Sequence, residues 1–282
     1  MNERLARRVK QLPTREGELH ALCPAGIGDF LWIWSKWHSV AKKRPVTFWF
    51  PQAEQNRAQP LAQMLGAHSG YLPDLSTDYV WSQPGEPKIP DTGAVLAVQP
   101  NRHLEAGHRI EKWYPRLPFA LPQPNILAKV YRQEADGFQY VVAFMCHAGY
   151  MEGNLLPGMW ARLFKEIEKA VAPVLIVAAG ADVGFARQVL NVFEPSLNPV
   201  FDAPLDQVAA LLQGAQLTVG VASGITILST YLGTPTLSAY PRCLAAMPGT
   251  WEQPEARSDW CFVDELALPT TLQRIERLCK TK

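Results

Sequence analysis

The chain has 282 residues, 48% of them hydrophobic, and its formal net charge at pH 7 is +1. That length and apolar content suffice for one large or two medium-sized domains with buried cores. The near-neutral charge gives no general attraction to polyanions, so nucleic acid is disfavoured as a partner.

The location expected from the sequence is the cytoplasm. The five cysteines form no CxxC pair, so no zinc knuckle is indicated, and their odd number without a framework suits a reducing compartment. Cys23 and Cys146 lie in apolar, strand-like runs and are expected to be buried thiols. No signal peptide and no apolar run of about 20 residues are found, so stable membrane insertion is not expected.

The first 18 residues are rich in Lys and Arg, diluted by three Glu. We interpret them as a solvated, partly disordered N-terminus, with weak contact to an anionic membrane or substrate as the alternative.

The first half of the chain alternates between strand and helix patterns. Strands are predicted at Leu19–Cys23, Pro45–Phe50 and Ala94–Val98, and helices at Asp29–Ala41 and Asn56–Leu65, the latter stopped by Gly66. From about Gln99 to Pro124 both patterns fail, and we expect a long irregular segment.

The second half alternates more regularly. Strands are predicted at Gln139–Cys146, Val174–Ala178, Leu217–Val221 and Thr236–Ala239. Helices are predicted at Met159–Ala170, from Asp182 to about Phe193, and at Pro204–Gln213, Ser223–Leu232 and Thr270–Cys279. Such alternation indicates βαβ units and parallel sheets.

These patterns predict an α/β protein with two domains, residues 1–130 and 131–282, joined near Gln123–Gly137. The last helix is a candidate to pack back on the first domain. Ligands of such folds bind outside the carboxyl ends of the strands, so a cleft between two facing domains is the expected site.

The stretch Gly26-Ile27-Gly28-Asp29 places a carboxylate where a glycine turn meets a helix. By composition alone Asp29 is most economically a helix cap, because Asp is favoured there. A carboxylate at a helix start is stabilised in its charged form, which makes it a weak base. It would act as a base if a closed site excluded water and raised its pKa.

The stretch from Gly220 to Thr236 is the most informative part of the chain. A strand ends near Gly220, Ser223 caps the next helix, and Gly224 permits close approach to the backbone. Unpaired N–H groups and the helix dipole favour a phosphate there. The alternative is an ordinary Ser cap without a ligand.

This stretch resembles the C-terminal signature of the ADP-heptose:lipopolysaccharide heptosyltransferases, a glycosyltransferase family 9-like group. The signature has an acid, Ser-Gly, two residues, His, and a helix that ends in Leu-Gly-Thr-Pro-Thr. Ser223-Gly224 and Leu232–Thr236 match it at the right separation, and Leu205–Val219 is similar to the preceding helix and strand. The Gly26–Asp29 turn and Val174–Gly180 also resemble family segments.

The resemblance implies a GT-B fold, with two Rossmann-like domains that face a central cleft. Asp29 would be the general base, with Gly26, Gly28, Arg102 and His108 on the acceptor side. The donor-binding residues implied are His147, Gly149, Asn154, Ser223, Gly224, Thr226 and Arg242. Family members of this type need neither metal nor cofactor, and the partners implied are a nucleotide-sugar donor and a glycolipid or glycan acceptor.

Three positions depart from the family pattern. Ala222 stands where the family has an acid, Ile227 where it has His, and Asn154 where it has a phosphate-contacting Lys. His147-Ala148-Gly149 resembles the family's His-Pro-Gly turn. ADP-heptose therefore does not follow as the donor.

Other side chains have structural alternatives beside functional ones. His147 and Arg242 lie at strand ends, where a ligand or only a hydrogen bond partner would meet them. Arg102 and His108 are acceptor candidates or surface residues. Trp34 and Trp37 are expected in the core, and Trp32 either packs there, stacks on a sugar or contacts a membrane surface.

The resulting hypothesis is a metal-independent glycosyltransferase of hexosyl or heptosyl type. The alternatives are a catalytically reduced binding protein for sugar nucleotides or glycans, and a glycosyltransferase that acts on a modified nucleic-acid base.

Overall fold

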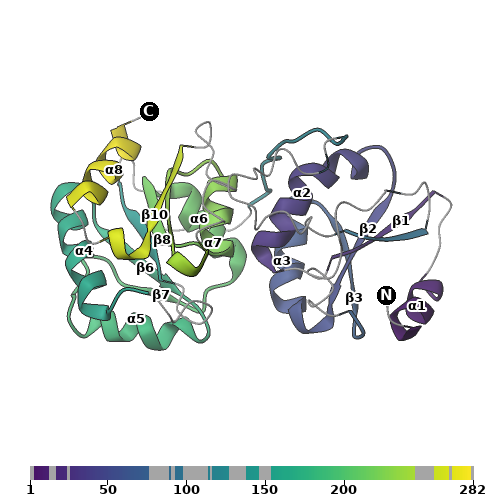
Figure 1. Ribbon diagram of the computed structural model, residues 1–282, viewed down its shortest axis with the longest axis horizontal. Coiled ribbons are helices and arrows are strands. Elements are labelled where there is room, and N and C mark those ends of the chain that lie inside the picture. The colour runs from purple at the N-terminus through teal and green to yellow at the C-terminus, as the bar shows by residue number, and fades with distance from the viewer. Residues whose placement is uncertain are drawn as a thin grey trace. The chain divides into compact units, whose positions relative to one another are not determined.

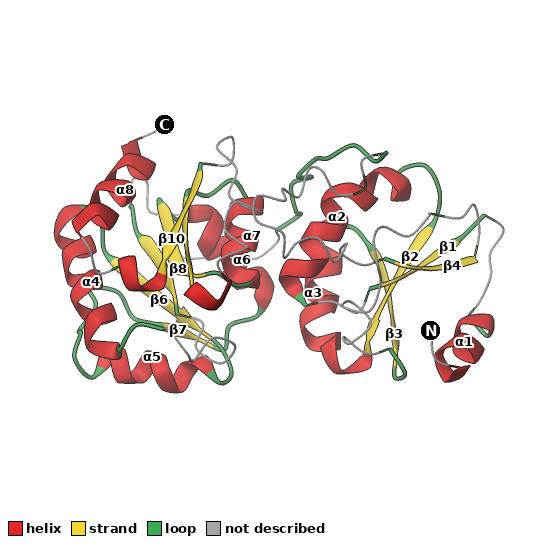
Figure 2. Ribbon diagram, viewed as in Figure 1, coloured by secondary structure: helices red, strands yellow, loops and turns green. Residues whose placement is uncertain are grey.

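The computed structural model describes residues 3–12, 17–23, 26–75, 89, 93–97, 114, 116–126, 138–145, 154–244, 257–266 and 269–280 (Figure 1). The chain divides into two compact units, Met1–Asn125 and Ile126–Lys282. Each unit is built on its own parallel β-sheet (Figure 2). The protein is thus an α/β protein with two Rossmann-like units, as expected.

Unit 1 carries a four-stranded sheet in the order β3-β2-β1-β4. Its elements are α1 (Glu3–Lys10), β1 (Leu19–Leu22), α2 (Ile27–Ala41), β2 (Val46–Pro51), the 3-10 turn η1 (Gln52–Glu54), α3 (Gln55–Leu65), β3 (His68–Leu72) and β4 (Gly93–Leu96). Helices α2 and α3 lie on one side of this sheet and α1 on the other (Figure 1).

Helix α2 is the centre of the unit 1 core. Phe30 makes edge-to-face contacts with Phe48 and Phe50 of β2, at centroid distances of 5.4 and 4.8 Å. Every residue from Phe30 to Val40 is buried, including Lys36. An α-helix presents only one face to a sheet, so its remaining faces require a second cover.

A strap of irregular chain, residues 116–125, provides part of that cover. The Ala120 N–H donates to the Ser35 carbonyl at 3.0 Å, and the Asn125 N–H donates to the Met64 carbonyl at 2.6 Å. The Lys36 ammonium donates to the Leu117 carbonyl at 3.3 Å, which ties a buried charge to the strap. The strap therefore fixes α2 from the side opposite the sheet.

Unit 2 carries a six-stranded sheet in the order β10-β9-β8-β5-β6-β7. Its elements are β5 (Val141–Phe144), α4 (Pro157–Ala170), β6 (Val174–Ala178), α5 (Asp182–Leu190), β7 (Val200–Phe201), α6 (Leu205–Gly214), β8 (Leu217–Val221), α7 (Gly224–Tyr231), β9 (Thr236–Tyr240), η6 (Arg242–Leu244), β10 (Ser258–Phe262), η8 (Val263–Glu265) and α8 (Pro269–Lys280). Counted from β5, this is the 3-2-1-4-5-6 order of a Rossmann sheet.

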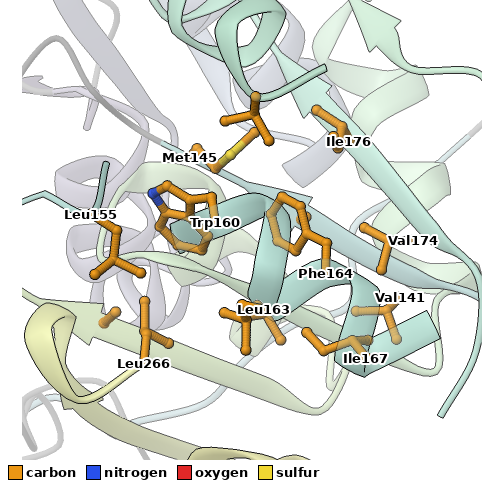
Figure 3. Close-up of a cluster of buried hydrophobic side chains, with 14 of the residues drawn as sticks. Val141, Met145, Leu155, Trp160, Leu163, Phe164, Ile167, Val174, Ile176 and Leu266 are labelled. Atoms are coloured by element: carbon orange, nitrogen blue, oxygen red, sulfur yellow. The ribbon is translucent and has the colours of Figure 1, made fainter. Parts of the chain in front are cut away.

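The main core of unit 2 lies between the sheet and helices α4, α5 and α8. Trp160 and Phe164 of α4 lie in contact, with ring centroids 5.5 Å apart. Phe164 lies beside Val174 and Ile176, and Trp160 lies beside Met145 and Leu155 (Figure 3). Helix α8 packs against α4 and β10, within unit 2. Its packing on unit 1 stays a prediction, and the expected border between residues 130 and 131 lies outside the described residues.

Gly220 allows the two central strands of unit 2 to approach at their carboxyl ends. It is opposite Phe144 in the register of β8 with β5. A Cβ atom at Gly220 would lie 2.2 Å from the Phe144 carbonyl oxygen, far inside contact distance. Only glycine fits this backbone contact.

A buried chain of hydroxyls fastens α7 to the sheet. Ser229 of α7 lies 2.8 Å from the Thr218 hydroxyl of β8 and 2.9 Å from the Thr236 hydroxyl of β9. The Thr234 hydroxyl donates to the Leu212 carbonyl at the end of α6, at 2.8 Å. The Leu-Gly-Thr-Pro-Thr stretch therefore holds α7 at a fixed place, which sets the position of its start at Ser223.

The sequence prediction missed four elements. Strands β3, β7 and β10 all lie at sheet edges, where a strand pairs on one side and needs few apolar residues. Helix α1 occupies a segment expected to be irregular, and Arg4 and Arg8 both pair with Asp74, at 2.7 and 3.3 Å. These partners are too distant in sequence for a local pattern to reveal.

Substituting Gly220→Ala should lower the free energy of unfolding by about 2–3 kcal/mol, because the new methyl group forces β8 away from β5. Gly184→Ala is the matched control. Gly184 lies inside α5, where an added methyl group would meet nothing within 4 Å, so alanine should stabilise the helix by about 1 kcal/mol. Urea unfolding of both variants measures the contrast, and equal effects would contradict this account of the β5–β8 contact.

Substituting Ser229→Ala should lower the free energy of unfolding by about 1–3 kcal/mol, because Thr218 and Thr236 both lose their shared hydroxyl partner in a buried place. Ser196→Ala, at an exposed hydroxyl, should change it by less than about 0.5 kcal/mol. Thermal or urea unfolding provides the comparison. If Ser229→Ala lowers the free energy of unfolding no more than Ser196→Ala does, the hydroxyl chain does not contribute to stability.

Candidate functional site

Asp29 lies at a topological switch point of unit 1. Strand β1 has β2 on one side and β4 on the other, and α2 leaves from the carboxyl end of β1. Ligands of open α/β sheets bind in the crevice outside such a point. Asp29 is in the first turn of α2, so the structure places it at the edge where a ligand is expected.

Burial, rather than the helix start, decides the charge state of Asp29. The pKa of Asp29 is raised from its usual 3.8 to about 6, and burial is the largest cause. The Gly26 N–H donates to Oδ2 at 3.3 Å and lowers the pKa. The charge of Glu54 raises it. From the sequence, we expected the helix start to favour the charged form of Asp29 and to keep it a weak base until a site closed around it. The structure reverses that expectation, because desolvation by the protein itself outweighs the helix start.

The two glycines before Asp29 have different places. Gly26 is the N-cap of α2, with extended backbone, and its N–H bonds to Asp29. Gly28 is buried inside the first turn of α2, because the helix begins at Ile27 and not at Asp29 as predicted. Gly28 is therefore part of the helix and not of a glycine turn.

Ser223 lies at the switch point of unit 2. Strands β5 and β8 are neighbours, and α4 leaves toward one face of the sheet while α7 leaves toward the other (Figure 1). Ser223 is the N-cap of α7, directly after β8. The predicted phosphate site thus lies at the crevice that the strand order creates.

The first turn of α7 is a reciprocal capping box. The Ser223 N–H donates to the Thr226 hydroxyl at 2.9 Å, and the Thr226 N–H approaches Ser223 Oγ at 3.5 Å. The Ile227 N–H donates to the Ser223 carbonyl at 3.0 Å. In the first turn of a helix this leaves the N–H groups of Gly224 and Ile225 for water or an anion.

Thr226 and Asn154, both predicted to bind the donor, have structural partners. The Thr226 side chain is buried and closes the capping box. Asn154 Oδ1 accepts from the Leu155 N–H at 2.8 Å and from the Trp160 indole at 3.2 Å, which orients the indole ring of the α4 core. Contact of either side chain with a donor stays a prediction.

Arg242, the other donor candidate, is exposed and already opposed by acids. It bonds to Asp264 at 2.9 Å, lies 3.5 Å from Glu265, and covers the Phe262 ring at 4.3 Å. An anion at Arg242 would have to compete with two carboxylates.

The remaining candidates for ligand contact are either buried or outside the described residues. Trp32 is buried, with 4% of its surface exposed, so it does not present a face to a sugar; Trp34 and Trp37 are also buried, as predicted. Arg102, His108, His147 and Gly149 lie outside the described residues.

The described residues contain neither a metal-binding cluster nor a membrane-spanning helix. No group of three or more His, Cys, Asp or Glu side chains is arranged among them to hold a metal ion. None of the described helices has both the length and the apolar character needed to cross a membrane.

The sequence interpretation overlooked Glu54. It follows β2 directly, in η1, and its charge acts on Asp29. The signal was present in the acid that ends Phe50-Pro51-Gln52-Ala53-Glu54, just after a strand beside β1.

Solved structures share this fold at low sequence identity. The chain is similar to the E. coli ADP-heptose lps heptosyltransferase II (TM-score 0.62, 13% identity, 93% of this chain and 98% of that one). It is also similar to a glycosyl transferase family 9 protein from Veillonella parvula DSM 2008 (TM-score 0.64, 10% identity, 96% and 99%). A third is the UDP-GlcNAc 2-epimerase from Neisseria meningitidis bound to UDP-GlcNAc (TM-score 0.52, 10% identity, 93% and 93%).

No family model matches the sequence. No curated protein matches it either. The similarity therefore extends to the fold, which is that of the GT-B glycosyltransferases and of the epimerases related to them in structure.

Proposed function

We propose that the protein is a glycosyltransferase that moves a sugar from a nucleotide-sugar to a hydroxyl acceptor. The observation that carries the proposal is Asp29, a carboxylate with a raised pKa at the switch point of a GT-B unit. A carboxylate that titrates near pH 6 is ionised at neutral pH and yet a stronger base than an ordinary Asp. Those are the properties that deprotonation of a hydroxyl requires.

In this proposal Asp29 takes the proton of the acceptor hydroxyl while that oxygen attacks the anomeric carbon. The bond from this carbon to the nucleotide diphosphate breaks, and the diphosphate leaves with its electron pair. Negative charge then grows on the leaving oxygens. The N–H groups of Gly224 and Ile225, together with the dipole of α7, are suited to stabilise that charge.

The finer assignment is a metal-independent transferase of hexosyl or heptosyl type, with a glycolipid or glycan acceptor. The capping box and the hydroxyl chain that fix the α7 start support it, since the fixed N–H groups of Gly224 and Ile225 can stabilise negative charge in place of a cation. Ala222 and Ile227 give the same turn less polarity than the family signature has, which favours a donor other than ADP-heptose.

Substituting Asp29→Asn should stabilise the protein above pH 6 and not below pH 4. The folded state binds the Asp29 proton more tightly than the unfolded state, so wild-type stability falls as pH rises from 3.8 through about 6. The full shift corresponds to about 3 kcal/mol, and partial exposure of Asp29 reduces the expected gain to about 1–2 kcal/mol. Urea unfolding at pH 4.5, 6 and 8 measures it; a gain independent of pH would rule out a raised pKa.

The function is tested by binding first and turnover second. ADP-, UDP- and GDP-sugars are screened by thermal shift, and nucleotide release is then followed with water, glycan and glycolipid acceptors. Asp29→Asn should bind the donor as wild type does and turn over at least about 100-fold more slowly. Asp206→Asn, which removes the same charge from the first turn of α6, should keep the wild-type rate.

The possible outcomes separate the candidate functions. Binding without turnover in wild type, with any acceptor, would favour the sugar-nucleotide binding protein. Conversion of the donor to another nucleotide-sugar without an acceptor would favour an epimerase. An unaffected rate in Asp29→Asn would remove Asp29 as the base, and absence of any nucleotide-sugar binding would refute the transferase itself.

A further inference from the structure

Glu54 lies at the same edge of unit 1 as Asp29. Strands β1 and β2 are parallel neighbours whose pairing continues to their carboxyl ends, where the Cys23 N–H donates to the Trp49 carbonyl at 2.7 Å. Asp29 is in the first turn of the helix that follows β1. Glu54 is the N-cap of the helix that follows β2. Both helices cover the same side of the sheet, so their starts are adjacent (Figure 1).

The charge of Glu54 is poorly compensated. Its Oε2 atom is buried and accepts no hydrogen bond from the described residues. Its nearest described cation is Arg57, whose Nη1 lies 3.8 Å from Oε2, beyond hydrogen bond distance. The Arg57 side chain is 72% exposed, whereas that of Glu54 is 23% exposed. Water therefore screens the cation more than it screens the anion.

The other ionisable groups around Asp29 are occupied elsewhere. On α2, Lys36 bonds to the Leu117 carbonyl and His38 to the Trp34 carbonyl, both two or more turns beyond Asp29. On β1, His20 accepts from the Trp49 indole, and burial raises the pKa of the Cys23 thiol, which keeps it neutral. The charge of Glu54, by contrast, acts on Asp29 and raises its pKa.

We propose that Glu54 is a positioning residue for the reaction, which makes Asp29 a stronger base through the repulsion of two neighbouring carboxylates. The inference rests on the proposed role of Asp29 and deepens it. Two neighbouring carboxylates resist simultaneous ionisation, so a proton on Asp29 relieves the repulsion. When the acceptor hydroxyl transfers its proton to Asp29, the charge of Glu54 favours that transfer, while Glu54 itself touches no reacting atom.

Arg57 provides a second test, in which the Asp29 pKa is expected to shift in the opposite direction. If the charge of Glu54 acts on Asp29, a cation beside Glu54 weakens that action. Removing Glu54's charge should lower the pKa of Asp29, and removing Arg57's charge should raise it. A merely structural role for the η1–α3 corner would not produce shifts of opposite sign.

The direct test is an NMR titration of the Asp29 side-chain carboxyl carbon in the free protein. Glu54→Gln should lower the Asp29 pKa by roughly half a unit or more. Arg57→Gln should raise it, and Glu276→Gln on α8 of unit 2 should leave it unchanged. No shift in Glu54→Gln, or shifts of the same sign in Glu54→Gln and Arg57→Gln, would overturn the proposal. If Glu54→Gln fails to fold, Glu54→Ala takes its place, and an unchanged Asp29 pKa in that variant refutes the coupling.

A rate profile connects this coupling to function. With the nucleotide-sugar that stabilises the protein, the acid limb of kcat against pH should move to lower pH in Glu54→Gln and to higher pH in Arg57→Gln. The plateau rate of Glu54→Gln should fall severalfold, since a weaker base accepts the proton less readily, while KM for the donor stays constant. An acid limb in wild type that does not coincide with the Asp29 titration would refute the proposed base, and the NMR result would still decide the role of Glu54.

Discussion

The close approach of β5 and β8 is the constraint on which the geometry of unit 2 depends. These strands are neighbours in the sheet but send their helices to opposite faces, which opens a crevice at their carboxyl ends. Gly220 permits the approach, since its missing side chain makes room for the Phe144 carbonyl. The capping box at Ser223 and the hydroxyls that anchor α7 then fix the helix start at the crevice. The stretch from Gly220 to Thr236, which resembles a family signature in sequence, therefore serves in large part to fix the start of α7.

At Asp29 two opposing effects act on one carboxylate, and their sizes decide the chemistry. The helix start and the Gly26 N–H favour the charged form, and burial with the nearby Glu54 favours the neutral form. Burial is the largest of these, so the pKa rises to about 6. The same carboxylate thus accepts the N–H of the α2 N-cap and costs a little stability at neutral pH, and both effects follow from one balance.

Local patterns predicted the inner strands, the apolar edge strand β4 and most helices, because apolar strands and amphipathic helices leave strong signals. The outer strands β3, β7 and β10 were missed because an edge strand needs little apolar surface. Asp29 and Ser223 were singled out because both lie where a strand turns into a helix, and their roles in a reaction stay predictions. The direction of the Asp29 shift and the involvement of Glu54 were not predictable, since both arise from neighbours that only the sheet brings together. Trp32 was ambiguous for a related reason: the strap that covers α2 comes from a segment without periodicity.

That strap also has a consequence for how the chain is made. Lys36 and the Leu117 carbonyl that it meets are 81 positions apart in the chain. At a synthesis rate of roughly 5–20 residues per second, the ribosome adds Leu117 roughly 4–16 s after Lys36. The side of α2 away from the sheet has no strap over it during this time. During that interval Ser35 and Lys36 of α2 lack their partners on the strap. The folding of unit 1 can therefore be completed only after the strap has left the ribosome.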